Sequence, residues 1–193
     1  MDKSSGYEEM AARFITSRGQ NLNGIGASSV RKWARTMPLG SCVLDLGCGT
    51  GIPISKVLID EGMTVYGIDA SATLITAFRK NFPNAPAACE PVEDSSFFNR
   101  KFDAIISWGL IFLLPEENQV RVLRKAADAL QHGGKLLFTA PHKKTEWEDV
   151  MTGRPSRSLG AERYKRLLSG AGLALMDEFE DEGENHYFSA VKI

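Results

Sequence analysis

The sequence has few of the residues that build disulfide frameworks or metal centres. Only three of its 193 residues are cysteine, at positions 42, 48 and 89, and no two of them form a CxxC motif. The three histidines, at positions 132, 142 and 186, lack the spacing of metal ligands. We therefore expect no metal site, and reduced thiols in a cytoplasmic protein.

Long apolar runs and an excess of charge are also absent. The longest nearly apolar run covers residues 104–114, too short for the ~20 residues that cross a bilayer. Lys and Arg number 23 against 24 Asp and Glu, a net charge of −1. This balance argues against binding to nucleic acid by counterion release, although a local basic patch stays possible. We expect neither a membrane nor a nucleic acid as partner.

Short apolar segments alternate with helical patterns through the middle of the chain. The apolar segments predict strands at residues 42–46, 63–68, 87–89, 102–107 and 135–140. Helices are predicted at 52–61, from an N-terminal cap at Ser71, and from Pro115 to the His132-Gly133-Gly134 stop. Alternation of this kind is typical of a parallel, doubly wound sheet with helices on both faces.

The C-terminal part completes the predicted sheet. A polar segment at 141–158 is expected to be a long loop, followed by a helix at 160–169. Strands at 173–180 and 186–193 are joined by the short turn DEGEN, which requires an antiparallel pair. The prediction is a Rossmann-like α/β fold whose seven-stranded sheet is mostly parallel, with the last strand antiparallel.

The first 40 residues are predicted to form a helical cap on an α/β core of residues 41–193, all within one domain. Ser5 and Glu8 have the spacing of a capping box at the start of a first helix. A second helix is expected from about Ser28, with Trp33 on its apolar face, ending at Pro38.

The strongest functional signal is VLDLGCGTG, residues 43–51, in which a buried strand runs into alternating glycines and then a helix. Gly47 and Gly49 allow positive φ and close approach of a ligand to the backbone. The helix start beyond them offers free N–H groups. A plain turn needs one glycine, so the pattern indicates a ligand-binding loop.

A dinucleotide site is the main competitor for this loop. Its G-x-G-x-x-G pattern is not met, because Gly51 comes one position early. Asp69, 20 residues after Gly49, ends the second strand and suits the two hydroxyls of a ribose. Asp45 adds a carboxylate that fits a cationic amino group better than a pyrophosphate. No Tyr-x-x-x-Lys pair of short-chain reductases is present.

VLDLGCGTG followed by VYGIDAS resembles motifs I and II of the class I S-adenosylmethionine-dependent methyltransferases. FDAIISWGLIFL looks like their fourth motif, and LQHGGKLLFTAP resembles the turn and fifth strand. The resemblance covers about residues 40–193. It implies S-adenosyl-L-methionine as the cofactor and methyl transfer as the reaction. A non-catalytic module that binds an adenosyl nucleoside or a partner protein is the alternative, and a nicotinamide oxidoreductase is a distant third.

The resemblance also implies which residues contact the cofactor. Gly47, Cys48 and Gly49 would line its methionine and ribose part, with Asp45 under the amino group through water. Asp69 would hold the ribose hydroxyls. Further contacts are expected from Ala70 on the adenine, Val92 and Glu93 at the adenine edge with Glu90 as the rival, Ser107 through its carbonyl, and Trp108 beside the sulfonium.

No large added domain for a macromolecular substrate is evident, so we expect a small-molecule acceptor, with a homodimer as the assembly considered. His142 and His186 lie at the carboxyl rim of the predicted sheet and are candidate general bases, although the reaction does not always need one. A lid over the pocket is expected from Phe14, Arg18, Trp33, Trp147 and Arg154.

Overall fold

The computed structural model describes residues 3–193 and contains one seven-stranded sheet of order β3-β2-β1-β4-β5-β9-β8. β9 runs antiparallel to both of its neighbours. The doubly wound fold and its antiparallel last strand are therefore confirmed. The strands are β1 (Cys42–Leu46), β2 (Thr64–Asp69), β3 (Ala87–Cys89), β4 (Phe102–Ser107), β5 (Leu130–Thr139), β8 (Leu173–Glu180) and β9 (His186–Lys192).

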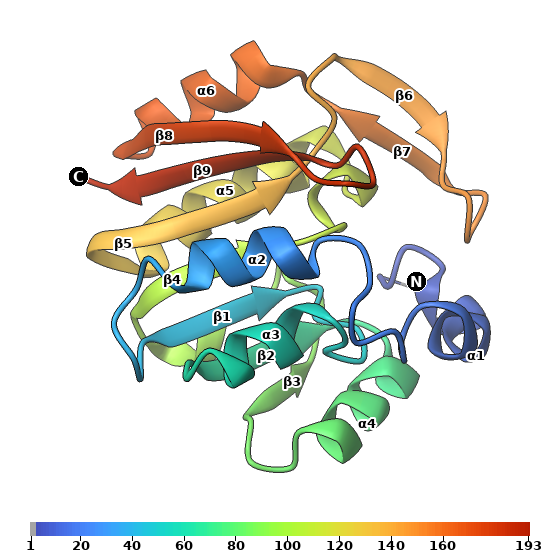
Figure 1. Cartoon of the computed structure of the whole chain (residues 1–193). Helices are drawn as coiled ribbons and strands as arrows, with labels where there is room; N and C mark the ends of the chain where they lie inside the picture. The colour runs from blue at the N-terminus through green and yellow to red at the C-terminus, as the bar shows by residue number, and fades with distance from the viewer. Residues whose placement is uncertain (1–2) are drawn as a thin grey trace.

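Helices cover both faces of this sheet (Figure 1). They are α1 (Tyr7–Ser17), α2 (Ala27–Ala34), α3 (Ile54–Asp60), α4 (Ala72–Asn81), α5 (Glu116–Ala129) and α6 (Ala161–Gly170), with short 3-10 turns η1 (Phe97–Asn99) and η2 (Ile111–Leu113). Within residues 3–193, no helix has the length and apolar character needed to cross a membrane.

The two-residue period of β1 decides which side chains meet which helices. Leu44 and Leu46 belong to the core under α5 and α6. Val43 belongs to the opposite core under α2 and α3. Asp45 faces the same side as Val43, where Ser55 of α3 donates a hydrogen bond to it. A carboxylate is thereby buried just below the glycine loop.

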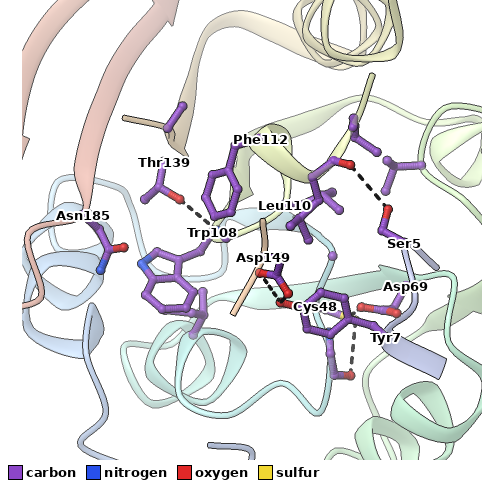
Figure 2. A pocket seen from close by; sticks show the side chains of 18 of the residues that line it. Ser5, Tyr7, Cys48, Asp69, Trp108, Leu110, Phe112, Thr139, Asp149 and Asn185 are labelled. Atoms are coloured by element: carbon purple, nitrogen blue, oxygen red, sulfur yellow. Dashed lines mark hydrogen bonds between the residues drawn. The ribbon is translucent and has the colours of Figure 1, made fainter. Parts of the chain in front are cut away.

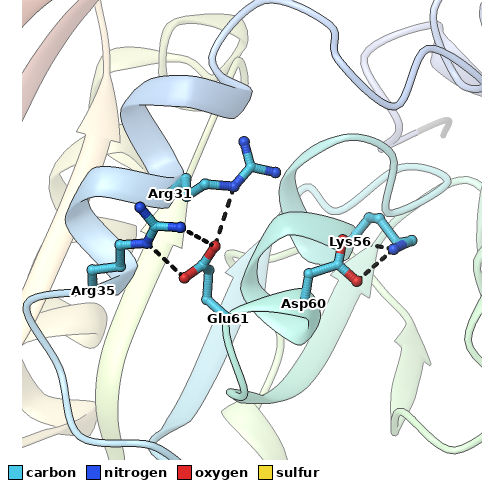
Figure 3. Close-up of polar contacts among 5 residues, drawn as sticks. All are labelled: Arg31, Arg35, Lys56, Asp60 and Glu61. Atoms are coloured by element: carbon cyan, nitrogen blue, oxygen red, sulfur yellow. Dashed lines mark hydrogen bonds and ion pairs between the residues drawn. The ribbon is translucent and has the colours of Figure 1, made fainter.

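The N-terminal segment is attached to the α/β core mainly through α2. Val30 and Trp33 are buried in the core that α2 shares with α3. Arg31 and Arg35 both donate to Glu61 at the end of α3, with nitrogen to oxygen distances of 3.2 and 2.8 Å (Figure 3). Exposed ion pairs of this kind contribute little beside the burial of apolar side chains. α2 is therefore integral to the fold.

The predicted loop at 141–158 is wrong in part, because it contains a β-hairpin. β6 (Thr145–Glu148) pairs antiparallel with β7 (Pro155–Ser158). This hairpin stands apart from the main sheet, beyond the carboxyl ends of the parallel strands, on the same side as α1 (Figure 1). Its polar sequence lacks the apolar alternation of a half-buried strand, which is why the pattern indicated a loop.

Two further boundaries differ from the predictions. α5 ends at Ala129, and the expected stop at residues 132–134 lies inside β5, which starts at Leu130. The capping box of Ser5 is also wrong, because the N–H of Glu8 is bound by the hydroxyl of Ser4. The Glu8 carboxylate instead binds groups at the start of α4.

Candidate functional site

A cavity of about 710 Å³ opens at the carboxyl ends of the parallel strands. Its walls come from the loops after β1, β2, β4 and β5, from α1, from the hairpin and from the turn between β8 and β9. This is the edge at which doubly wound sheets bind ligands. Eleven of the twelve predicted site residues line the cavity: Asp45, Gly47, Cys48, Gly49, Asp69, Ala70, Val92, Glu93, Trp108, His142 and His186.

Ser107 is the one predicted site residue that does not line the cavity. It is the last residue of β4, is 1% exposed and pairs in register with Phe138 of β5. Its hydroxyl has no hydrogen-bond partner within residues 3–193. Its position in the middle of the sheet places it behind the cavity wall.

Asp69 is held in a fixed orientation at the end of β2. One carboxylate oxygen accepts a hydrogen bond from the N–H of Gly49 at 2.9 Å, and the other from the N–H of Ser71 at 2.8 Å. Burial raises the pKa of Asp69, while these two hydrogen bonds oppose the rise. Each oxygen keeps a lone pair for a further donor, as the two hydroxyls of a ribose would supply.

Asp45 is more deeply buried and less well solvated. It is 2% exposed and accepts a hydrogen bond of 2.6 Å from Ser55. Burial raises the pKa of Asp45 from 3.8 to about 7, a rise that the Ser55 hydrogen bond opposes and the Asp69 carboxylate increases. A cationic group bound nearby would favour its ionised form.

The glycines of the loop have different tasks. A Cβ at Gly51 would lie 2.4 Å from Phe82, so this glycine is required by packing. A Cβ at Gly49 would meet only the Phe14 ring at 3.5 Å, an ordinary contact on the cavity side. Cys48 lies between Gly47 and Gly49, and burial raises the pKa of its thiol well above the usual range. The thiol is therefore protonated and acts as a small spacer.

The predicted adenine edge contains a buried carboxylate that is only half satisfied. Glu93 is 8% exposed and accepts a hydrogen bond from Asn118 through one oxygen. The other oxygen has no partner within the described part of the chain. Lys125 donates to the carbonyls of Val92 and Glu93 and so fixes the loop. An orphaned buried acceptor is costly, which favours a ligand with an N–H donor here, whereas Glu90 does not line the cavity.

The opposite half of the cavity is aromatic. The indole of Trp108 is oriented by a 2.7 Å hydrogen bond to the hydroxyl of Tyr187, which donates in turn to Asp181 at 2.8 Å. The rings of Phe112 and Trp147 lie 5.4 Å apart. Figure 2 shows Trp108 and Phe112 on one side of the pocket and Asp69 on the other. The cavity thus has two chemically distinct halves.

The two candidate bases are neighbours at the rim of the aromatic half. The rings of His142 and His186 meet edge to face with centroids 5.0 Å apart. His186 Nε2 lies 3.2 Å from a carboxylate oxygen of Glu178. His142 is exposed, whereas the His186 side chain is 10% exposed. Within residues 3–193, no group of three or more His, Cys, Asp or Glu side chains is arranged to hold a metal ion.

Part of the site comes from residues that no sequence pattern had indicated. Tyr7 and Asp149 lie 142 positions apart, yet the Tyr7 hydroxyl is 3.4 Å from an Asp149 oxygen across the cavity mouth. Of the expected lid, Phe14, Arg18 and Trp147 line the cavity. Trp33 instead lies in the core under α2, and Arg154 packs outside the cavity against Gly6.

Comparison with known proteins agrees with this geometry. Residues 43–134 match the family described as the methyltransferase domain. Aklanonic acid methyltransferase DauC of Streptomyces sp. (strain C5) is 30% identical over 146 residues, which cover 72% of this chain and 61% of that protein. An uncharacterized methyltransferase of Anoxybacillus flavithermus is 31% identical over 104 residues, or 51% of this chain and 46% of that protein. The chain thus spans less than two thirds of these relatives.

Solved structures share the whole fold. Magnesium protoporphyrin IX methyltransferase (ChlM) from Synechocystis PCC 6803, with bound SAM, superposes with a TM-score of 0.72. The match covers 100% of this chain and 98% of that one at 16% identity, which shows the fold alone. The family match, the fold and the glycine loop with its following Asp69 agree, and the chain belongs to the class I S-adenosylmethionine-dependent methyltransferases.

Proposed function

We propose that the protein transfers a methyl group from S-adenosylmethionine to a small-molecule acceptor. The observation that carries this proposal is one cavity in which Asp69, bound to the N–H of Gly49, lies on one side and Trp108 and Phe112 lie on the other. Such a chamber places a nucleoside site beside an acceptor site. The methyltransferases identified above as relatives support the same reaction.

The lining residues fit the cofactor at three points. Asp69 would accept both ribose hydroxyls, and Asp45 would balance the charge of the amino group. The unpartnered oxygen of Glu93 would accept the adenine amino group, which removes the cost of leaving it buried alone. Gly47, Cys48 and Gly49 would border the methionine part, with Ala70 and Val92 against the base and Trp108 beside the sulfonium.

The bound cofactor supplies an electrophilic methyl group. The protein's own contribution is to orient the acceptor and to exclude water, which can account for ~7–11 kcal/mol of the barrier. α1 supports this by closing the cavity over Gly49 through Phe14. His142 or His186 would accept a proton from acceptors that carry one.

A small molecule fits the lining better than a nucleic acid does. The acidic side chains Asp45, Asp69, Glu93, Asp149, Glu180 and Glu184 outnumber Lys3, Arg18 and Lys143. Binding to nucleic acid depends on an excess of cationic groups. A volume of about 710 Å³ lies within the range of small-molecule sites. Whether the protein forms a homodimer stays a prediction.

The proposal is tested by calorimetric titration with S-adenosylmethionine and S-adenosylhomocysteine. Asp69→Ala removes two charge-assisted hydrogen bonds and is expected to weaken binding by roughly 100-fold. Asp60→Ala is the matched control, because among the described residues the Asp60 carboxylate pairs with Lys56 alone, on the surface of α3 (Figure 3). Absence of binding by the unmodified protein would refute the proposal. Binding without release of S-adenosylhomocysteine across acceptor classes would favour the non-catalytic alternative.

A further inference from the structure

The proposed function does not identify the methyl acceptor. The aromatic half of the cavity restricts the chemical class to which the acceptor can belong. Resting on that function, we propose that the acceptor is a planar aromatic hydroxyl compound, a phenol. His186 takes its proton, and Glu178, a residue outside the cavity lining, holds His186 in position.

Glu178 is fixed at both carboxylate oxygens. Lys165 of α6 lies 2.8 Å from one oxygen, and His186 Nε2 lies 3.2 Å from the other. Burial raises the pKa of Glu178, but the hydrogen bonds from Lys165 and His186 outweigh this and lower it. Glu178 is therefore an ionised acceptor, and the imidazole donates to it through Nε2–H. A base oriented by a third group is the arrangement found in catalytic triads.

This tautomer leaves Nδ1 of His186 as the nitrogen that can accept a proton. The nearest charged group on that side is Glu180, whose oxygen is 3.6 Å away, beyond hydrogen-bond length. The Glu180 side chain is 61% exposed and leaves room for an acceptor. His142 packs edge to face on His186, and the Phe188 ring lies on another side with centroids 4.9 Å apart. The imidazole is thus confined on most sides and open toward the cavity.

The aromatic walls of the cavity suit a flat ring. Trp108, Phe112 and Trp147 all line the cavity. Trp108 cannot rotate freely because its N–H is bound by the hydroxyl of Tyr187, which is itself held by Asp181. Aromatic rings prefer offset or edge-to-face contacts with other rings. A planar acceptor would contact these side chains with little loss of conformational entropy.

The presence of an oriented base favours a phenol over the other classes of acceptor. A carboxylate is already ionised at neutral pH and would need a cation instead, but Lys143 next to His142 is exposed at the rim. A thiol is ionised to a useful extent without help. A cationic amine would need a buried carboxylate facing it, but Glu180 and Glu184 are exposed, and the buried Asp149 already accepts two hydrogen bonds from Thr152. A phenol has an ordinary pKa near 10 and needs its proton removed.

The step balances without a further reactant. The phenolic O–H bond breaks and its proton moves to Nδ1 of His186. A bond forms between the phenol oxygen and the methyl carbon as the carbon–sulfur bond breaks, and the electron pair of that bond stays on sulfur. The imidazolium then loses its proton to solvent at the open rim beside His142.

The test uses 4-nitrophenol, whose phenolate absorbs at longer wavelength than the phenol, with the protein saturated with S-adenosylhomocysteine. Bound 4-nitrophenol is expected to ionise at a pH about one unit below its midpoint in water, a tenfold change in the proton equilibrium. Glu178→Gln is expected to abolish this shift. Asp177→Asn is expected to keep it, because the exposed side chain of Asp177, next to Glu178 on the same strand, does not line the cavity. Lys165→Met, which removes the anchor of Glu178, should reduce the shift and guards against a folding defect in the first variant.

A second measurement separates acceptor classes. With S-adenosylmethionine, release of S-adenosylhomocysteine is expected with unsubstituted phenol and not with benzoate or benzylamine. Equal turnover of benzoate or benzylamine would overturn the inference, as would an unshifted phenolate band or a shift that survives Glu178→Gln. If S-adenosylhomocysteine binds and one of these outcomes occurs, only the proposed acceptor class is refuted. If S-adenosylhomocysteine does not bind, the proposed function is refuted as well.

Discussion

Two carboxylates close to the glycine loop differ because of their surroundings. Asp69 accepts two backbone N–H groups and remains at the cavity wall. Asp45 has one hydroxyl partner and is almost fully buried. A buried carboxylate with few donors holds its proton more strongly. Of these two groups, the protonation of Asp45 is therefore the more sensitive to pH and to a bound cation.

Replacement of Asp45 by Asn is expected to change the pH dependence of stability. The pKa of Asp45 rises from 3.8 to about 7 on folding, so the folded protein binds more protons than the unfolded chain within this window. The free energy of unfolding should therefore fall as pH rises from about 4 to 7, by at most ~4 kcal/mol. Urea unfolding at several pH values measures this fall, which Asp45→Asn should largely remove. An identical slope in the variant would contradict the assignment.

Substitutions at Gly49 and Gly51 should separate ligand contact from packing. Gly49 has φ +54°, so Gly49→Val costs roughly 1–2 kcal/mol of backbone strain and lowers the melting temperature by about 2–8 °C. It should also abolish S-adenosylmethionine binding, because the side chain enters the cavity. Gly51→Val forces a clash with Phe82 and should prevent folding. Calorimetry and thermal denaturation measure both, and unchanged affinity of Gly49→Val would make the loop purely structural.

At the level of elements, α1 is tied to α4 by a single carboxylate. Glu8 accepts hydrogen bonds from the N–H and the hydroxyl of Thr73, at 3.1 and 2.7 Å, and from the hydroxyl of Ser71. The Ser71 hydroxyl also caps α4 by accepting the N–H of Leu74, as predicted. The start of α4 and the lid over the cavity are thus stabilised by the same contact.

Glu8→Ala is expected to loosen α1 and the first turn of α4 together. Loss of an N-terminal capping contact of this kind should increase amide hydrogen exchange in both segments by roughly fivefold or more. Glu9→Ala is the control on the same helix, since Glu9 is exposed and lies 3.8 Å from Arg154. Exchange that rises equally in both variants would show that Glu8 does not connect the two helices.

At the scale of the whole molecule, the N-terminal cap and the α/β core are expected to unfold together. α2 shares a buried core with α3, β1 and β4, so separating residues 1–40 would expose Val43 and Val57. Unfolding followed by tryptophan fluorescence, which includes Trp33, and by far-ultraviolet circular dichroism should give coincident midpoints. Two separated transitions would divide the chain into two domains.

Local patterns were sufficient where a structure depends on neighbours along the chain. The strand at 42–46, the glycine loop and the Ser71 cap were predicted correctly, because each is set by hydrophobic period, backbone freedom or a side chain three residues away. The hairpin of β6 and β7 was missed because its exposed strands carry no apolar period. The end of α5 was misplaced because β5 begins at Leu130, before the apolar segment at 135–140 from which this strand was predicted.

The sequence alone determined the fold class and the family, and it predicted a site at the carboxyl edge of the sheet, since these follow from short-range patterns. Only the tertiary structure brought Tyr7 to Asp149, Trp108 to Tyr187 and Glu8 to Thr73, pairs separated by 65 to 142 positions. Such contacts depend on how the helical crossovers pack on the sheet. Hydrophobic periodicity is a local property, so it does not predict which distant side chains come into contact. The proposed acceptor class likewise rests on contacts of the folded chain, from Lys165 of α6 through Glu178 to His186, which no sequence pattern predicted.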